Sequence, residues 1–233
     1  MEHVTRLLLF DIDGTLVLSG GAGGRAMRRA FKDVFGFEDG LTSISMAGRT
    51  DAWIVSQMLA QHGLPESHTD RQRFHDIYIE YLRTEIAEPH PDKQVLAGVR
   101  ELLDVLVQRN DVYLALLTGN YRRGAEVKLE HFDLWRYFAA GAYGDNSHDR
   151  NGLLWTAMDN VKAAGGPHVR PSETVIIGDT PLDVAVAVAG GARCLGVGTG
   201  GYDVDTLLES GADEAVPDLT DLGDVLRRLQ LTV

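Results

Sequence analysis

The sequence predicts an α/β fold in which helices cover both faces of a parallel sheet and a small all-helical unit follows the first strand. Along most of the chain, short continuous apolar runs alternate with helical hydrophobic patterns, as parallel strands and their crossover helices do. Between about residues 18 and 92, only helical patterns occur. The length of 233 residues suits one α/β domain with a sizeable insert, or two small domains.

Four apolar runs predict the strands of the sheet. Each is short and continuous, which is typical of a strand buried on both faces. The first run ends in Asp-Ile-Asp-Gly, and the last run is the weakest of the four. The predicted strands span residues 6–10, 112–117, 174–177 and 194–197.

Helical periodicity predicts the elements between and after these strands. Residues 97–108, 121–131, 152–164, 182–189 and 220–230 each carry such a pattern. Three further amphipathic patterns fill the insert, and the glycine-rich segment 20–24 and the proline-bracketed segment 89–91 are its predicted hinges. We therefore predict a core domain of residues 1–17 and 93–233, and a helical domain of residues 18–92.

Composition argues against several classes of protein. Lys and Arg number 22 against 34 Asp and Glu, and a net charge of −12 should repel nucleic acid and anionic lipid. The apolar stretches are too short for a signal peptide or a membrane span, so we expect a soluble, cytoplasmic protein with no nucleic-acid or membrane partner. The single cysteine, Cys194, excludes an internal disulfide and a cysteine-cluster metal site.

Polar residues follow three of the predicted strands. Ligands bind at the carboxyl ends of the strands in open α/β sheets, so these residues should gather at one edge. The three strand ends supply Asp11 and Asp13, then Thr118 and Asn120, then Asp179. Carboxylates crowded together repel unless a cation lies among them, and all-oxygen ligation suits magnesium that also bridges to a substrate phosphate.

Each strand end also admits a purely structural role. Asp and Gly after a strand commonly form turns, and Thr118 or Asn120 could cap the following helix. Thr180, Pro181 and Asp183 together resemble a capping box. Because a helix start can also hold a phosphate and its metal, Asp183 is compatible with both roles.

Three segments resemble motifs of the haloacid dehalogenase superfamily. Asp-Ile-Asp-Gly-Thr-Leu at 11–16, Leu-Thr-Gly-Asn at 117–120 and Gly-Asp-Thr-Pro-Leu-Asp at 178–183 are similar to its motifs one, two and four, in the family's order. The helical insert lies where that family's helical cap lies. The resemblance implies a Rossmann-like core with a cap domain, and an enzyme similar to phosphoglycolate phosphatase.

The resemblance also implies roles for individual residues. Asp11 matches the nucleophile that becomes an aspartyl-phosphate, and Asp13 matches the general acid/base. Mg²⁺ would be held by Asp11, the Asp13 backbone carbonyl and Asp179, with Asp183 in support. The expected phosphate-binding residues are Ile12, Thr118, Gly119, Asn120 and Arg150.

Motif three departs from the family, which usually has a lysine some thirty residues after motif two. The corresponding window, residues 145–152, contains no lysine, and Arg150 has the right position. An arginine can pair with carboxylate and phosphate oxygens in a forked geometry. The alternative is Lys162, which the predicted helix places too near motif four.

Substrate specificity is expected from the cap, where Arg49 could bind a carboxylate or a second phosphate, or could be a solvated surface residue. We predict a Mg²⁺-dependent phosphatase that hydrolyses a small phosphomonoester. A β-phosphoglucomutase-like mutase, a pyrophosphatase and an inactive phosphate-binding protein remain alternatives, because the core residues do not separate the enzymes. The expected partner is a small phosphorylated metabolite, and the expected assembly is a monomer or a homodimer.

Overall fold

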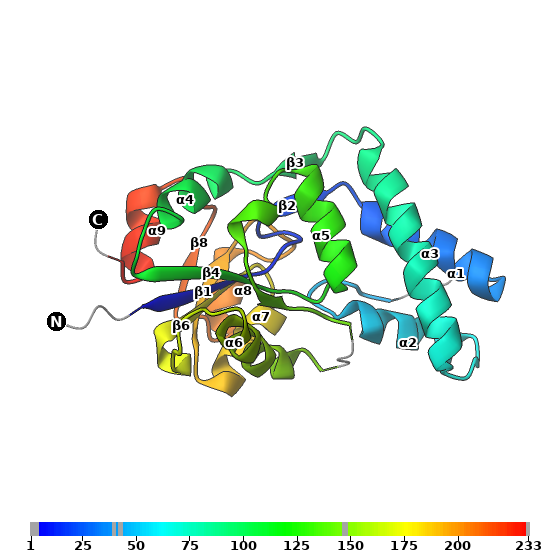
Figure 1. Ribbon diagram of the computed structural model, residues 1–233. Coiled ribbons are helices and arrows are strands. Elements are labelled where there is room, and N and C mark those ends of the chain that lie inside the picture. Colours follow the sequence, from blue (N-terminus) through cyan, green and yellow to red (C-terminus); the bar gives the residue numbers. More distant parts are fainter. Residues whose placement is uncertain (1–4, 39–40, 42–43, 146–148, 232–233) are drawn as a thin grey trace.

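A six-stranded parallel sheet forms the centre of the computed structural model, which describes residues 5–38, 41, 44–145 and 149–231 (Figure 1). The strand order is β5-β4-β1-β6-β7-β8, so β1 lies inside the sheet between β4 and β6. This arrangement confirms the predicted α/β class. The strands are β1 (Arg6–Phe10), β4 (Val112–Leu117), β5 (Gly141–Ala142), β6 (Thr174–Gly178), β7 (Arg193–Val197) and β8 (Glu214–Val216).

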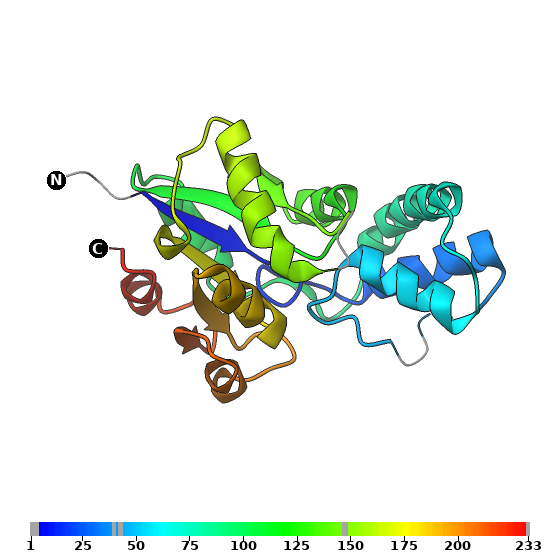
Figure 2. The same ribbon diagram turned by 90° about the horizontal axis from the view of Figure 1, so that it is seen from below.

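Both faces of the sheet are buried, which explains why its strands are continuous apolar runs. In β1, Leu8 and Phe10 join the core on one face, and Leu7 and Leu9 join the core on the other. The first core receives α4 (Val99–Leu106), α5 (Arg122–His131) and α9 (Leu222–Arg228). The second receives α6 (Leu153–Ala163), α7 (Pro181–Gly190) and α8 (Val204–Glu209) (Figure 2).

Three helices form a separate layer beside the sheet, on the right of Figures 1 and 2. They are α1 (Ala22–Phe35), α2 (Asp51–Gln61) and α3 (His68–Ala87), and they bury an apolar core of their own. Tyr121 and Val127, at the start and on the face of α5, belong to that same core. The helical layer is therefore packed onto α5 of the sheet domain.

A short antiparallel hairpin links the helical layer to the sheet. It pairs β2 (Val17–Ser19) with β3 (Lys93–Val95), at the two places where the chain passes between the layers. Gly20 and Gly21 follow β2 with positive φ angles, as a tight connection requires. Gly23 and Gly24, which we expected in a hinge, instead form part of the first turn of α1.

Several short elements were not predicted from the sequence. They are β2, β3, β5, β8 and α8, each of two to six residues. Among the described residues, no helix has both the length and the apolarity to cross a membrane.

Candidate active site

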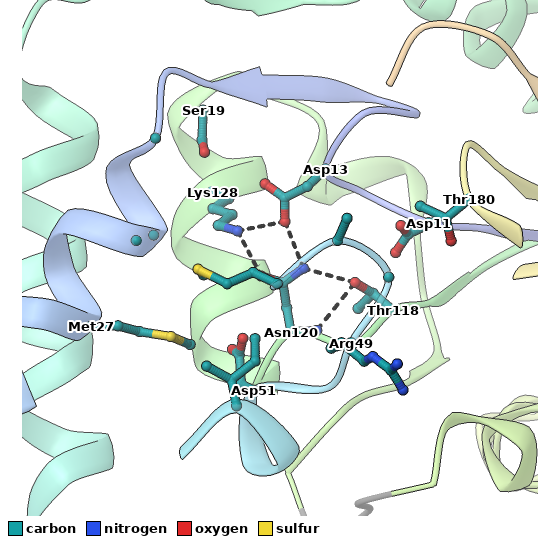
Figure 3. Close-up of a pocket in the computed structure, with 18 of the residues that line it drawn as sticks. Asp11, Asp13, Ser19, Met27, Arg49, Asp51, Thr118, Asn120, Lys128 and Thr180 are labelled. Atoms are coloured by element: carbon teal, nitrogen blue, oxygen red, sulfur yellow. Dashed lines mark hydrogen bonds and ion pairs between the residues drawn. The ribbon is translucent and has the colours of Figure 1, made fainter. Parts of the chain in front are cut away.

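A cavity of about 280 Å³ lies where the ends of β1 and β4 face the helical layer (Figure 3). Its polar side chains come mainly from the sheet domain, and its apolar ones from the helical layer. That volume is at the small end of ligand sites in proteins, so it suits a small metabolite. The lining includes Asp11, Asp13, Thr118, Asn120, Lys128 and Arg150 from the sheet domain, and Met27, Met46, Ile54 and Tyr78 opposite them.

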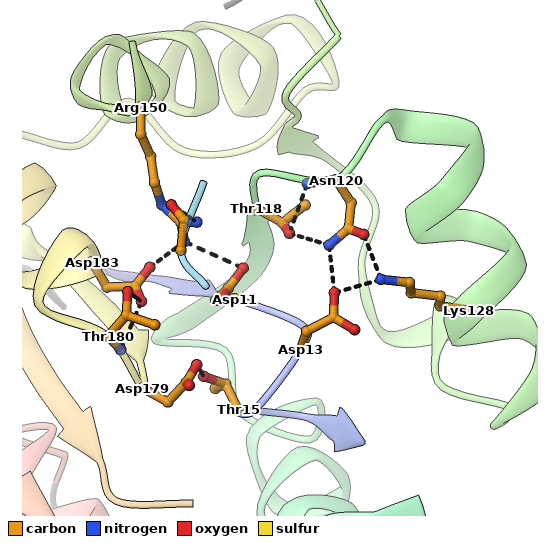
Figure 4. A network of polar contacts seen from close by, with 11 residues as sticks. Asp11, Asp13, Thr15, Thr118, Asn120, Lys128, Arg150, Asp179, Thr180 and Asp183 are labelled. Atoms are coloured by element: carbon orange, nitrogen blue, oxygen red, sulfur yellow. Dashed lines mark hydrogen bonds and ion pairs between the residues drawn. The ribbon is translucent and has the colours of Figure 1, made fainter. Parts of the chain in front are cut away.

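Three buried carboxylates meet at one side of this cavity (Figure 4). Asp11 follows β1, Asp179 follows β6, and Asp183 lies in the first turn of α7; oxygens of the three lie within 4.8 Å of one another. Burial raises the pKa of Asp11 to about 6. Burial, together with the charges of Asp11 and Asp183, raises the pKa of Asp179 to about 8. The cluster therefore favours a bound proton or a bound cation.

Arg150 supplies part of the positive charge that the three carboxylates require. It lies in the short 3₁₀ turn Arg150–Gly152, is 7% exposed, and has Nη2 3.3 Å from Asp11 Oδ1 and ion-paired with Asp183 Oδ1. When all three carboxylates are ionised, the single guanidinium leaves two negative charges, which matches a divalent cation. The oxygen donors of Asp11 and Asp179 are the type that hard cations prefer.

The predicted motif-three position is therefore inside the site, although residues 146–148 of its window lie outside the described residues. Lys162, the alternative, is exposed on α6. The Nε atom of Arg150 is buried and has no hydrogen-bond partner among the described residues. The guanidinium thus keeps its Nε donor unused.

Two threonines orient two of the three clustered carboxylates, Asp179 and Asp183. Thr15 Oγ1 donates to Asp179 Oδ1 at 3.0 Å. The amide and hydroxyl of Thr180 both donate to Asp183 Oδ2, at 3.1 and 2.8 Å. Because Arg150 occupies the other oxygen, Asp183 has both oxygens engaged by the protein, and its geometry suits support of a metal site better than direct ligation. Thr15, which follows the motif-one glycine, was not predicted from the sequence.

A second polar network surrounds Asp13, beside the first (Figure 4). Asn120 Nδ2 donates to Asp13 Oδ2 at 2.9 Å and to Thr118 Oγ1 at 2.8 Å. Lys128 Nζ donates to Asp13 Oδ2 at 2.5 Å and to Asn120 Oδ1 at 2.7 Å. Lys128 was not predicted from the sequence, although one signal was available: it follows Gly124 and Ala125 at the spacing of the buried face of α5.

The loop before α2 is hydrogen-bonded to the end of β4. Asp51 N donates to the Gly119 carbonyl at 2.7 Å, and Tyr121 N donates to Asp51 Oδ2 at 2.8 Å. A Cβ atom on Gly119 would lie 2.1 Å from the Arg49 carbonyl oxygen, so only glycine allows this approach. Arg150 adds a third link, because its Nη1 donates to the Gly48 carbonyl at 2.8 Å.

Two predicted residues remain, Ile12 and Arg49. The backbone amide of Ile12 donates a hydrogen bond to the Asp11 carboxylate. This hydrogen bond lowers the pKa of Asp11 and so partly offsets the effect of burial, which raises it. Arg49 lines the cavity, but its guanidinium lies over the Trp53 ring, 4.5 Å from the centroid, and points away from Asp13 and Lys128 in Figure 3. A role for Arg49 in binding substrate stays a prediction.

Known proteins share both this sequence pattern and this fold. The family model for haloacid dehalogenase-like hydrolases matches residues 8–197. Phosphoglycolate phosphatase 1 of Pseudomonas aeruginosa is 30% identical over 86% of this chain and 72% of its own length. The phosphoglycolate phosphatase of Pseudomonas syringae pv. tomato is 28% identical over 84% of this chain and 70% of its own.

Among solved structures, a hydrolase from Pseudomonas syringae superposes with a TM-score of 0.69, covers 97% of this chain and 99% of its own, and is 22% identical. That likeness concerns the fold. The match of the family model over most of the chain, together with the named relatives, identifies the enzyme class. The chain belongs to the haloacid dehalogenase-like hydrolases, and it is a phosphatase, a hydrolase of phosphoric monoesters.

Proposed function

We propose that this phosphatase is Mg²⁺-dependent and hydrolyses a small phosphomonoester through an aspartyl-phosphate on Asp11, with 2-phosphoglycolate as the first substrate to test. The observation that carries the proposal is the convergence of Asp11, Arg150 and Asp179 at one end of a small cavity, with Asp13 and Thr118 beside them. The names of the relatives suggest the substrate.

The residues present fit a magnesium site. Asp11 and Asp179 would hold the ion with the Asp13 backbone carbonyl, while Asp183 would keep Arg150 and the start of α7 in place. When bound, Mg²⁺ supplies positive charge that offsets the negative charge of the phosphoryl group and of Asp11.

In the first half of the reaction, the Asp11 carboxylate attacks phosphorus and the bond to the leaving oxygen breaks. Asp13 gives its proton to that oxygen, so an alcohol leaves. Thr118 Oγ1 and the guanidinium of Arg150 donate to phosphoryl oxygens, and their positions are fixed before substrate arrives, by Asn120 and Asp183 respectively.

In the second half, a water molecule attacks the phosphorus of the aspartyl-phosphate. Asp13, now ionised, takes a proton from this water, and phosphate leaves from Asp11. The loop at residues 48–51 is hydrogen-bonded to the end of β4 and lines the cavity. The water that reacts is the one that lies beside Asp13.

The test is phosphate release from a panel of small phosphomonoesters, with and without Mg²⁺, by the wild-type protein and by Asp11→Asn. We expect Mg²⁺-dependent release that the substitution abolishes, with 2-phosphoglycolate among the best substrates. A different best substrate would change the substrate assignment and leave the mechanism in place. A folded protein that releases no phosphate from any ester would refute the proposal.

A further inference from the structure

The buried ammonium group of Lys128 has no part in the mechanism described so far. Its side chain is 5% exposed and lines the cavity, two turns into α5. Lysine is rarely buried this completely unless its charge is paired and hydrogen-bonded, since removing an ammonium group from water costs several kcal/mol. The position therefore calls for an explanation beyond packing.

Lys128 pairs with the predicted acid/base residue and with its amide neighbour. Nζ is 2.5 Å from Asp13 Oδ2 and 2.7 Å from Asn120 Oδ1. An ammonium group only donates, so it requires the oxygen of the Asn120 amide on its side. The Asn120 nitrogen must then face the other way, where it donates to Asp13 Oδ2 and Thr118 Oγ1.

Both donors act on the same oxygen of Asp13. Oδ2 receives the ammonium group and the amide, whereas Oδ1 has no hydrogen-bond partner among the described residues, and Asp13 remains 40% exposed beside the cavity. Two donors on one oxygen fix the rotation of the carboxylate. The free oxygen is therefore held in one orientation.

We propose that Lys128 is a positioning residue that, with Asn120, anchors Asp13 through Oδ2 so that Oδ1 exchanges the proton with the leaving oxygen and with water. This inference rests on the proposed function, because it assigns Asp13 the acid/base role. Lys128 touches no reacting atom. It acts on the orientation of Asp13, both directly and through Asn120.

Esters with different leaving groups separate this role from a structural one. An alkyl phosphate such as 2-phosphoglycolate needs Asp13 as an acid in the first half-reaction. The leaving group of p-nitrophenyl phosphate is p-nitrophenolate, which is stable without a proton, so this ester does not need the acid. Both need Asp13 as a base in the second half. We therefore compare rapid-mixing kinetics of the two esters with wild-type protein, Lys128→Met, Lys128→Arg and the control Lys162→Met, a lysine exposed on α6.

For Lys128→Met we expect the first half-reaction with 2-phosphoglycolate to slow by about 10- to 100-fold, because the acid is misplaced. Release of p-nitrophenol in the first turnover should change by less than about threefold. Slow hydrolysis should then produce a burst of p-nitrophenol in which phosphate accumulates on the enzyme. Lys128→Arg should recover part of the loss, and Lys162→Met should match wild type.

Equal slowing of both esters without a burst, or no slowing of either, would overturn the inference. The ratio of the first-turnover rates of the two esters is measured on one protein sample, so it does not depend on the fraction of the protein that folds. A wild-type protein without activity on either ester would instead refute the proposed function. An active wild type whose Lys128→Met variant keeps the wild-type ratio refutes only the role of Lys128.

Discussion

Replacement of Arg150 by Met tests the charge balance of the site most directly. Met has a similar length and no charge, so it leaves Asp11 and Asp183 buried and facing each other without their shared cation. The variant also loses the donor to the Gly48 carbonyl, which links the loop before α2 to the sheet domain. Stability and turnover should therefore both fall.

The separation of the charges sets the size of the effect. Arg150 Nη2 lies 3.3 Å from Asp11 Oδ1, and at an effective dielectric constant of about 20 this pair interacts by about 5 kcal/mol. Removing one partner of a buried pair typically costs about 3–5 kcal/mol, since the remaining charge stays buried. Loss of a fixed donor to the transferring phosphoryl group should lower kcat by about 10²- to 10³-fold.

Urea unfolding of the metal-free protein, followed by tryptophan fluorescence, measures the stability, and phosphate release measures kcat. Arg170→Met is the matched control: its side chain is 76% exposed and paired with Glu173, so it should change the free energy of unfolding by less than about 1 kcal/mol. Arg150→Lys keeps the charge with one nitrogen and should retain intermediate activity. If Arg150→Met loses less than about 1 kcal/mol and keeps its kcat, the charge argument is wrong.

Three further outcomes can be measured. The pKa of Asp179 rises from 3.8 to about 8 on folding, so the metal-free fold holds a proton that the unfolded chain has lost, and its stability should fall as pH rises between these values. Because Mg²⁺ displaces that proton, the Tm gain at saturating Mg²⁺ should grow from about pH 6 to about pH 8; a constant or shrinking gain contradicts this. Asp179→Asn removes the unfavourable charge, so its metal-free Tm at about pH 8 should equal or exceed that of wild type, with no gain from Mg²⁺; a Tm clearly below wild type argues against it. Gly119→Ala places a methyl group against the Arg49 carbonyl, so kcat/KM should fall by about tenfold or more through a displaced loop, and an unchanged kcat/KM would show that the loop tolerates the shift.

The sequence was sufficient to predict the main strands, because burial on both faces leaves a continuous apolar run. The runs at 6–10 and 112–117 coincide with β1 and β4, and the other two differ from β6 and β7 by one residue at one end. β5 and β8 were missed because two or three residues carry no periodicity. Their places come from pairing with β4 and β7, which is a tertiary effect.

Part of the candidate site was predictable for a related reason. Asp11, Thr118 and Asp179 follow predicted strands, and parallel strands deliver their ends to one edge. Lys128 and Asp51 were not selected, because charged residues on helices are usually solvated. Their burial arises only when the helical layer packs onto α5, where Asp51 binds the backbone of Tyr121 and burial raises the pKa of Asp51 to about 7.

The loop before α2, which is hydrogen-bonded to the end of β4, makes its contacts with the sheet domain largely through main-chain atoms. The carbonyl of Gly48 binds Arg150, and the amide of Asp51 binds the carbonyl of Gly119. A hydrogen bond from a peptide group is the same for almost any side chain. The residue at position 49 can therefore change during evolution without loss of docking. Related phosphatases built this way could acquire new substrates by substitution at that position, while the main-chain hydrogen bonds that hold the loop beside the nucleophile are kept.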